Sequence, residues 1–193
     1  HKDRGYKNLE EVIAKSKAKP NTLIAGIGGK FGAHDVLANA VNGYKKAGFR
    51  IVAYDGGASL KKATIANEVD ICIIHSPVLL NEVKAGLLNV IGTGGSLAKI
   101  TYPPIQNTKT LREMGIPADV GVTRGVWAPK GTPKSVIQKL EKFIKAAANS
   151  AEFKKFGNNF GFAPKYYTSA QFLDLLKLEQ GVYTDIKGKF MSK

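Results

Sequence analysis

The segment AGIGGKFGAHD, residues 25–35, has four glycines in eleven positions and lies between an apolar run and a helical one. Free backbone N–H groups at the start of a helix, together with the helix dipole, can bind an anion. Glycine also lets the backbone approach a ligand closely and reach positive φ. The segment could therefore bind a phosphate, bind a smaller anion such as a carboxylate, or only form a turn.

A nucleotide site fits this segment poorly. Its third glycine stands one place late for the dinucleotide fingerprint, and the spacing G-x-x-x-x-G-K-[ST] is missing. Asp55 follows the second apolar run, but it lies in another glycine turn rather than at the position of a ribose-binding acid. We favour a carboxylate-sized anion, and a purely structural turn stays open.

Polar residues with similar placement follow two further apolar runs. YDGG, with Tyr54, Asp55 and Gly56, follows the second run, and HSP, with His75 and Ser76, follows the third. Ligands of open α/β sheets bind at the carboxyl ends of strands, beside helix N-termini. His75 could donate to a ligand or satisfy the backbone, and Ser76 is expected to cap a helix that begins at Pro77.

Catalytic and metal-binding patterns are missing. The chain has three histidines and one cysteine, without a G-x-S-x-G, H-E-x-x-H or CxxC motif. Cys72 lies in the apolar run VDICII, where a thiol behaves as a small buried hydrophobe. His34 has no second ligand at metal-binding spacing. We therefore expect no catalytic residue, no metal and no enzyme activity.

The net charge of +14 makes nucleic acid the first partner to test. The lysines are spread over helical segments, and no nucleic-acid-binding motif is present, so we expect an anionic ligand instead. No stretch approaches eighteen consecutive apolar residues, and we expect no direct membrane insertion. The first residues show no secretory signal pattern, so such a signal is expected to be absent from this chain.

The central residues alternate between strand-like and helical runs, which predicts a parallel sheet with crossover helices. The predicted strands are 22–27, 50–54, 69–74, 88–93 and 125–128. Helical spacing near the ends predicts a helix at 8–18 capped by Asn8, one after Thr132 and Pro133, and one opened by a Thr168–Gln171 capping box. A short helix is also expected at 110–114, and we expect the helix at 8–18 to pack with the C-terminal helices.

Several ordered pieces of the chain resemble the periplasmic solute receptors of the tripartite tricarboxylate transporter family, also called Bug or TctC-type proteins. The pieces are LEEVIAKSKAKPNTLIAGIGG, His34 with LANAV, YDGGASLKKATIANEVDI, HSPVLLNEVKAGLLNVIGTGG, TLREMGIP and APKGTP. The spacing from Tyr54 to Asp70 matches the family's Y-K-G-x-A-x-A-L…G-x-V-D block, and APKGTP is similarly specific.

The resemblance implies a periplasmic-binding-protein-like α/β fold that closes on a small organic acid or amino acid without a cofactor. Residues 20–122 would be the family's second domain, a parallel-sheet ligand-binding domain. Residues 1–19 and 123–193 would be the return segment and helices of an incomplete first domain. The resemblance also implies a periplasmic or extracellular membrane-associated location and membrane permease subunits as partners.

Three departures from the family pattern bear on the site. The usual N-terminal segment is lacking, so the chain could be a fragment, one of two chains, or a divergent member. Asp55 replaces the family's lysine, and Ile74–His75 replaces its Asp-Asn pair. Thr123 and Arg124 replace aromatic residues, and Arg124 could pair with a ligand carboxylate or remain a solvated surface residue.

The sequence thus predicts an extracytoplasmic receptor that captures a small carboxylate for a transporter by domain closure. The alternatives are a nucleotide-dependent α/β enzyme that uses the glycine loop, and a sensor with the receptor fold. The residues predicted to bind the ligand are Gly28, Gly29, Lys30, Phe31, Gly32, Ala33, His34, Tyr54, Asp55, Gly56, His75 and Arg124.

Overall fold

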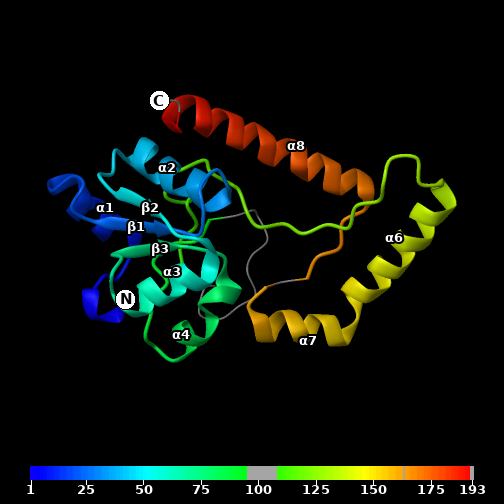
Figure 1. Ribbon diagram of the computed structural model, residues 1–193, viewed down its shortest axis with the longest axis horizontal. Helices are drawn as coiled ribbons and strands as arrows, with labels where there is room; N and C mark the ends of the chain where they lie inside the picture. Colours follow the sequence, from blue (N-terminus) through cyan, green and yellow to red (C-terminus); the bar gives the residue numbers. More distant parts are fainter. Residues whose placement is uncertain (95–107, 163, 192–193) are drawn as a thin grey trace.

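A three-stranded parallel sheet with the order β2-β1-β3 forms the centre of the α/β part of the chain (Figure 1). The computed structural model describes residues 1–94, 108–162 and 164–191. The strands are β1 (Ile24–Ile27), β2 (Arg50–Ala53) and β3 (Ile71–Ile73). Gly26 of β1 pairs with Val52 on one side and Cys72 on the other, so β1 is the central strand.

Parallel strands need crossover connections, and helices provide both of them. α2 (Ala33–Lys45) joins β1 to β2, and α3 (Gly56–Ile65) joins β2 to β3. All three strands therefore end at the same edge of the sheet, as predicted. The glycine segment, Tyr54–Asp55 and Ile74–His75 all begin at that edge.

Alternate residues of β1 face two different layers of helices. Ala25 belongs to a buried cluster with residues of α1 and α2. Gly26 faces α3, where a Cβ atom would lie 2.6 Å from Cδ1 of Leu60. The missing side chain at Gly26 thus lets α3 pack closely against the centre of the sheet.

α1 (Leu9–Ala18) begins as predicted, because the Asn8 side chain accepts a hydrogen bond from the backbone N–H of Glu11. The expected packing of this helix with the C-terminal helices holds only for the end of the last one, because residues 134–160 contribute nothing to the core cluster that contains Leu9, Val12 and Ile13. Its buried residues Leu9, Val12 and Ile13 instead share one core cluster with Ala25 and with α2. The C-terminal helices contribute to this cluster mainly through Ile186, which is fully buried at the end of α8.

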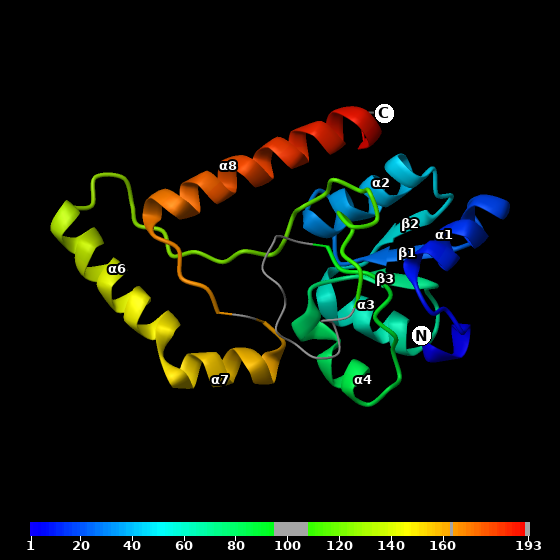
Figure 2. The same cartoon turned by 180° about the vertical axis from the view of Figure 1, so that it is seen from behind.

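The C-terminal helices form an arm beside the sheet (Figures 1 and 2). They are α6 (Lys134–Asn149), α7 (Ala151–Phe160), α8 (Ser169–Ile186) and the π-helical turn η3 (Lys187–Met191). α8 begins with the predicted capping box of Thr168 and Gln171 and runs back to α2. There the ring of Phe190, in η3, packs edge-on against Tyr44 of α2, with 4.9 Å between the ring centroids. α6 has no buried residue.

Several predicted elements take other forms. Residues 88–93 and 125–128 are not strands; the former region has only an isolated bridge between Thr93 and Thr110. The apolar run at 125–128 pairs with no strand in the described part of the chain. Its side chains Val126 and Trp127 are 72% and 68% exposed. The expected helix at 110–114 is a hydrogen-bonded turn.

Two helix starts also differ from the prediction. α6 begins at Lys134 with Pro133, not Thr132, at the cap position, while the Thr132 hydroxyl donates to the Pro129 carbonyl. After β3 the chain forms a short 3-10 helix, η2 (Ser76–Val78), and then α4 (Leu80–Lys84). The division into a unit at 20–122 and flanking segments stays a prediction. In the described residues, no helix is both long and apolar enough to cross a membrane.

A network around Asp70 ties the N-terminus to the sheet. Asp70 is only 5% exposed, and its carboxylate accepts hydrogen bonds from the Arg4 guanidinium at 2.5 Å and from the backbone N–H of Ile24 at 2.7 Å. Arg4 also donates to the side chain and the carbonyl of Asn67. A buried, fully bonded carboxylate of this kind stabilises the fold only while its partners remain.

We expect Asp70→Ala to lower the free energy of unfolding by about 3 kcal/mol, because it leaves Arg4 and the Ile24 N–H without their acceptor. Urea denaturation followed by circular dichroism measures this change. Asp174→Ala is the matched control, since Asp174 is exposed and its ion pair with Lys177 is 3.8 Å long. Equal stability losses in the two variants would contradict a structural role for Asp70.

Candidate functional site

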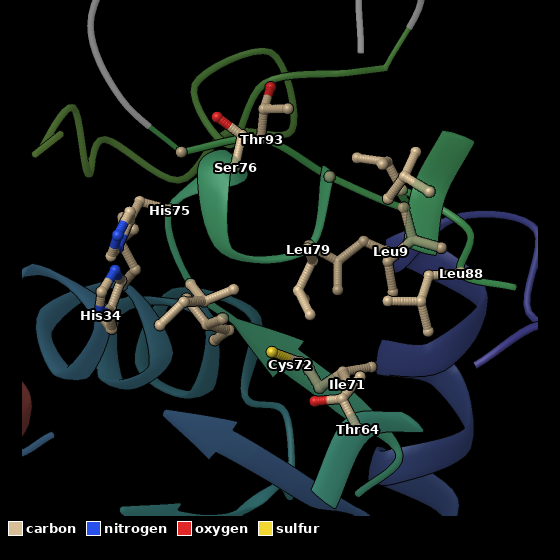
Figure 3. Close-up of a pocket in the computed structure, with 18 of the residues that line it drawn as sticks. Leu9, His34, Thr64, Ile71, Cys72, His75, Ser76, Leu79, Leu88 and Thr93 are labelled. Carbon is tan, nitrogen blue, oxygen red and sulfur yellow. The ribbon is translucent and has the colours of Figure 1, made fainter. Parts of the chain in front are cut away.

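A cavity of about 370 Å³ opens where the carboxyl end of β3, the start of α2 and the segment 120–124 meet (Figure 3). Its polar lining includes His34, His75, Ser76, Thr93 and Arg124. Volumes of about 300–1,000 Å³ are typical of small-molecule sites. The cavity therefore has the size and the position expected for a ligand site in an open α/β sheet.

Two histidines stack against each other on one side of the cavity. The ring centroids of His34 and His75 lie 5.6 Å apart with an interplanar angle of 12°. Figure 3 shows both imidazoles together, His34 on α2 and His75 in the loop after β3. Parallel strands bring these two histidines together because their loops leave the same edge of the sheet.

One nitrogen of each ring is buried without a hydrogen-bond partner in the described residues. These atoms are His34 Nε2 and His75 Nδ1. A buried polar atom without a partner is unfavourable, so such atoms are uncommon in folded proteins. A ligand with hydrogen-bonding oxygens could satisfy both nitrogens at once.

The electrostatics of the pair favour neutral imidazoles. Burial lowers the pKa of His34, and the neighbouring His75 lowers it further. Burial also lowers the pKa of His75, with a further contribution from the positive charge of Arg124. At neutral pH each ring then has one N–H donor and one acceptor nitrogen, while Arg124 supplies the permanent positive charge.

Ser76 connects this cavity to the C-terminal arm. Its hydroxyl donates a 2.6 Å hydrogen bond to the carbonyl of Gly161, the residue that ends α7. Ser76 is therefore not the helix cap that the sequence predicted; His75 holds the cap position and Pro77 lies within the first turn. Phe162, just after Gly161, also lines the cavity, so the site includes residues from both parts of the chain.

The glycine loop is partly satisfied by the chain itself. The backbone N–H of Phe31 donates to the Asp35 carboxylate at 2.8 Å, and Asn39 donates to the same side chain. Phe31 is 83% exposed and Gly29 has φ of 136°. α2 then begins at Ala33 after Gly32, which has no side chain to cap the first free N–H groups.

The cavity brings together four of the residues predicted to bind the ligand: Ala33, His34, His75 and Arg124. The others lie outside its lining, and their ligand contacts stay predictions. They are Gly28, Gly29, Lys30, Phe31, Gly32, Tyr54, Asp55 and Gly56. Gly28 nevertheless adjoins the site, because a Cβ atom there would lie 3.5 Å from His34 Nδ1 and 2.6 Å from Ile74 Cδ1.

Sequence reasoning missed the apolar wall of the cavity. Leu79, Leu88, Leu9, Ile71 and Cys72 line the side away from the histidines (Figure 3). Burial raises the pKa of the Cys72 thiol to about 11, so it is a neutral part of this wall. The apolar character of these positions was visible, but their assembly depends on segments that are distant in the sequence. No group of three potential metal ligands occurs in the described residues.

Comparison with known proteins gives one matching family and two curated relatives. Residues 1–183 match the family described as tripartite tricarboxylate transporter family receptor. The UPF0065 protein in the gbd 5' region of Cupriavidus necator is 26% identical over 170 residues, covering 88% of this chain and 51% of that protein. A UPF0065 protein of Bordetella pertussis is 28% identical over 165 residues and is covered to 48%. The chain thus spans about half the length of these relatives.

Solved structures share the fold. A protein of R. palustris solved with adipate superposes with a TM-score of 0.78 at 18% identity, covering 95% of this chain and 61% of that one. MatC from Rhodopseudomonas palustris, solved with bound malate, gives 0.78 at 20% identity, covering 96% of this chain and 63% of that one. The periplasmic binding protein BugD gives 0.77 at 20% identity, with 95% and 62% covered.

We expect Arg124→Ala to raise the pKa of His75, because it removes a positive charge that disfavours protonation of that ring. The pKa of His34 should stay nearly unchanged, since Arg124 does not contribute to its shift. Titration of the imidazole nitrogens by NMR measures both values. Lys130→Ala, which removes an exposed charge outside the cavity lining, is the control. An unchanged His75 pKa in Arg124→Ala would show that the charge of Arg124 does not act on this ring.

Proposed function

The chain belongs to the tripartite tricarboxylate transporter receptor family, and we propose that it is an extracytoplasmic receptor that binds a small carboxylate. The observation that carries this proposal is one cavity lined by the start of α2, two imidazoles with unpartnered nitrogens, and Arg124. Each of these groups can donate to a carboxylate oxygen. A binding protein needs no catalytic residue, and the family consists of receptors rather than enzymes.

The solved relatives support the ligand class. Two proteins with the same fold were solved with adipate and malate, which are both small carboxylates. The net charge of +14 adds a general attraction for anions. The ligand carboxylate would accept hydrogen bonds from His34 and His75 and pair with the guanidinium of Arg124 at the exposed mouth of the cavity.

Closure of two units around the ligand would complete the site. The start of α2 and the loop after β3 supply His34 and His75, while the segment 120–124 and Phe162 connect to the arm of α6 and α7. The arm already meets the cavity at Gly161 and Phe162, and a further rotation at these connections would close it over the bound acid and exclude water. The closed form would be recognised by the membrane permease subunits of a transporter, in the periplasm or at the outer face of the membrane.

The nucleotide-dependent enzyme is less well supported. A phosphate site in the loop 28–32 needs free backbone N–H groups, but the N–H of Phe31 already donates to Asp35. Two of the three buried side-chain atoms without a partner in the described residues, His34 Nε2 and His75 Nδ1, belong to residues that line the cavity instead. Nucleotides should therefore leave the melting temperature unchanged, whereas the carboxylate ligand should raise it.

We expect Arg124→Gln to weaken carboxylate binding about tenfold, because a charge-assisted hydrogen bond is lost. Isothermal titration calorimetry with malate and adipate measures the dissociation constants. Lys177→Gln removes the same charge from an exposed position outside the cavity and serves as the control. An unchanged dissociation constant in Arg124→Gln would remove Arg124 from the site.

We also expect Gly28→Val to weaken binding at least tenfold while the fold is retained. The new side chain would displace Ile74 and press on the His34 ring, which lines the cavity. Gly181→Val is the matched control, because Gly181 lies in α8 outside the cavity lining and a Cβ atom there meets nothing within 4 Å. The same calorimetry, with circular dichroism to verify folding, compares the two variants. Equal binding by Gly28→Val and the wild type would contradict a site beside this loop.

A further inference from the structure

The cavity has two chemically different ends. The stacked rings of His34 and His75 form one side, with Ser76 and Thr93 nearby (Figure 3). The opposite side is formed mainly by leucine side chains and by the β3 residues Ile71 and Cys72. Thr64 also lies on this side, but its hydroxyl already donates to the carbonyl of Leu60. Such a cavity matches a ligand that is polar at one end and apolar at the other.

We propose that the ligand is a monocarboxylic acid with an apolar tail, its carboxylate on the His34–His75 pair and its tail against the leucine wall. This inference rests on the proposed receptor function and specifies the substrate class of the same site. The leucine wall is defined here as Leu9, Leu79 and Leu88. Leu9 and Leu88 are 6% and 7% exposed, so their side chains belong to the folded interior around the cavity.

The carboxylate end is fixed by the unpartnered ring nitrogens. His34 Nε2 and His75 Nδ1 are both buried, and the rings are stacked only 5.6 Å apart. Each neutral imidazole can present one N–H, and with ring centroids this close both rings can donate to the same carboxylate group. Arg124 lines the mouth on the same side, where it can add a charge-assisted bond.

The far end of the cavity disfavours a second carboxylate. The titratable groups that line the cavity away from the mouth are His1, Tyr6, Asp70 and Cys72. The Asp70 carboxylate is negative and already holds Arg4, and the Cys72 thiol stays neutral. A second carboxylate would lose its hydration there, and the Arg4 guanidinium is already bonded to Asp70 and Asn67, which opposes binding. An alkyl or aryl tail has no such cost.

The first experiment compares acids by chain length in calorimetry on the full 193-residue chain. Acetate, butyrate, hexanoate and octanoate should bind progressively more tightly, by about threefold to fourfold per methylene until the cavity is filled. Adipate is the matched control for hexanoate, because it has the same six carbons and a second carboxylate. Hexanoate should bind at least tenfold more tightly than adipate.

The second experiment removes one residue of the leucine wall. Leu79→Ser should abolish most of the gain from butyrate to octanoate while leaving acetate binding nearly unchanged. Leu79 holds the cap position of α4, and serine is a favoured residue at helix caps, so α4 can still form. Leu87→Ser is the control, because Leu87 is 44% exposed and lies outside the cavity lining.

Cys72 provides an independent readout of tail position. It is the single cysteine of the chain and lines the cavity, so a small thiol reagent reports on access to this wall. Because the pKa of the thiol is raised to about 11, the reaction is followed at alkaline pH, where the reactive thiolate forms. Saturating octanoate should slow the modification of Cys72 at least fivefold, and saturating acetate should leave the rate nearly unchanged. Equal protection by both acids would overturn the position assigned to the tail.

The results separate this inference from the proposed function. Binding of malate or acetate that depends on Arg124 but does not increase with chain length would overturn the apolar-tail ligand and leave the receptor function intact. Tighter binding of adipate than of hexanoate would likewise overturn the apolar-tail ligand and leave the receptor function intact. Failure of every acid to bind would overturn both.

Discussion

The parallel pairing of β1 with both of its neighbours is the constraint on which the site depends. It makes three strands end at one edge of the sheet, so three loops begin there. His34 and His75 stack because the segments that carry them leave adjacent strands at this edge. The close packing of α3 on Gly26 holds the central strand from the other face. Without this pairing, the segments that carry the two imidazoles would not begin side by side.

Apolar periodicity and helix-capping residues in the sequence were sufficient to predict much of the sheet and its helices. The strands β1, β2 and β3, the crossover helices and the caps at Asn8 and Thr168 were predicted, because periodicity and capping depend on neighbouring residues. The apolar runs at 88–93 and 125–128 were wrongly predicted as strands. An apolar pattern shows that a segment can pair, but it does not show whether a partner strand lies beside it.

The site was predictable only in part, for a related reason. The rule that ligands bind at the carboxyl ends of parallel strands correctly selected the loops that carry His34 and His75. It did not reveal that Asp35 accepts the N–H of Phe31, which leaves the glycine loop less free to bind an anion. It also could not reveal the leucine wall, because Leu9 and Leu88 reach the cavity from segments far apart in the sequence. Side-chain directions across such distances are set by the whole fold.

The distribution of charge around the cavity has a physical logic. A lysine or arginine buried beside the leucine wall would be costly in the unliganded protein, because a charge loses its hydration there. Neutral imidazoles avoid most of that cost and can still donate to an anion, and burial lowers the pKa of both histidines. Arg124 is exposed at the mouth, where it stays hydrated until a ligand arrives. The permanent charge of Arg124 thus lies where water can stabilise it, and the buried donors are the neutral imidazoles, which lose little hydration energy.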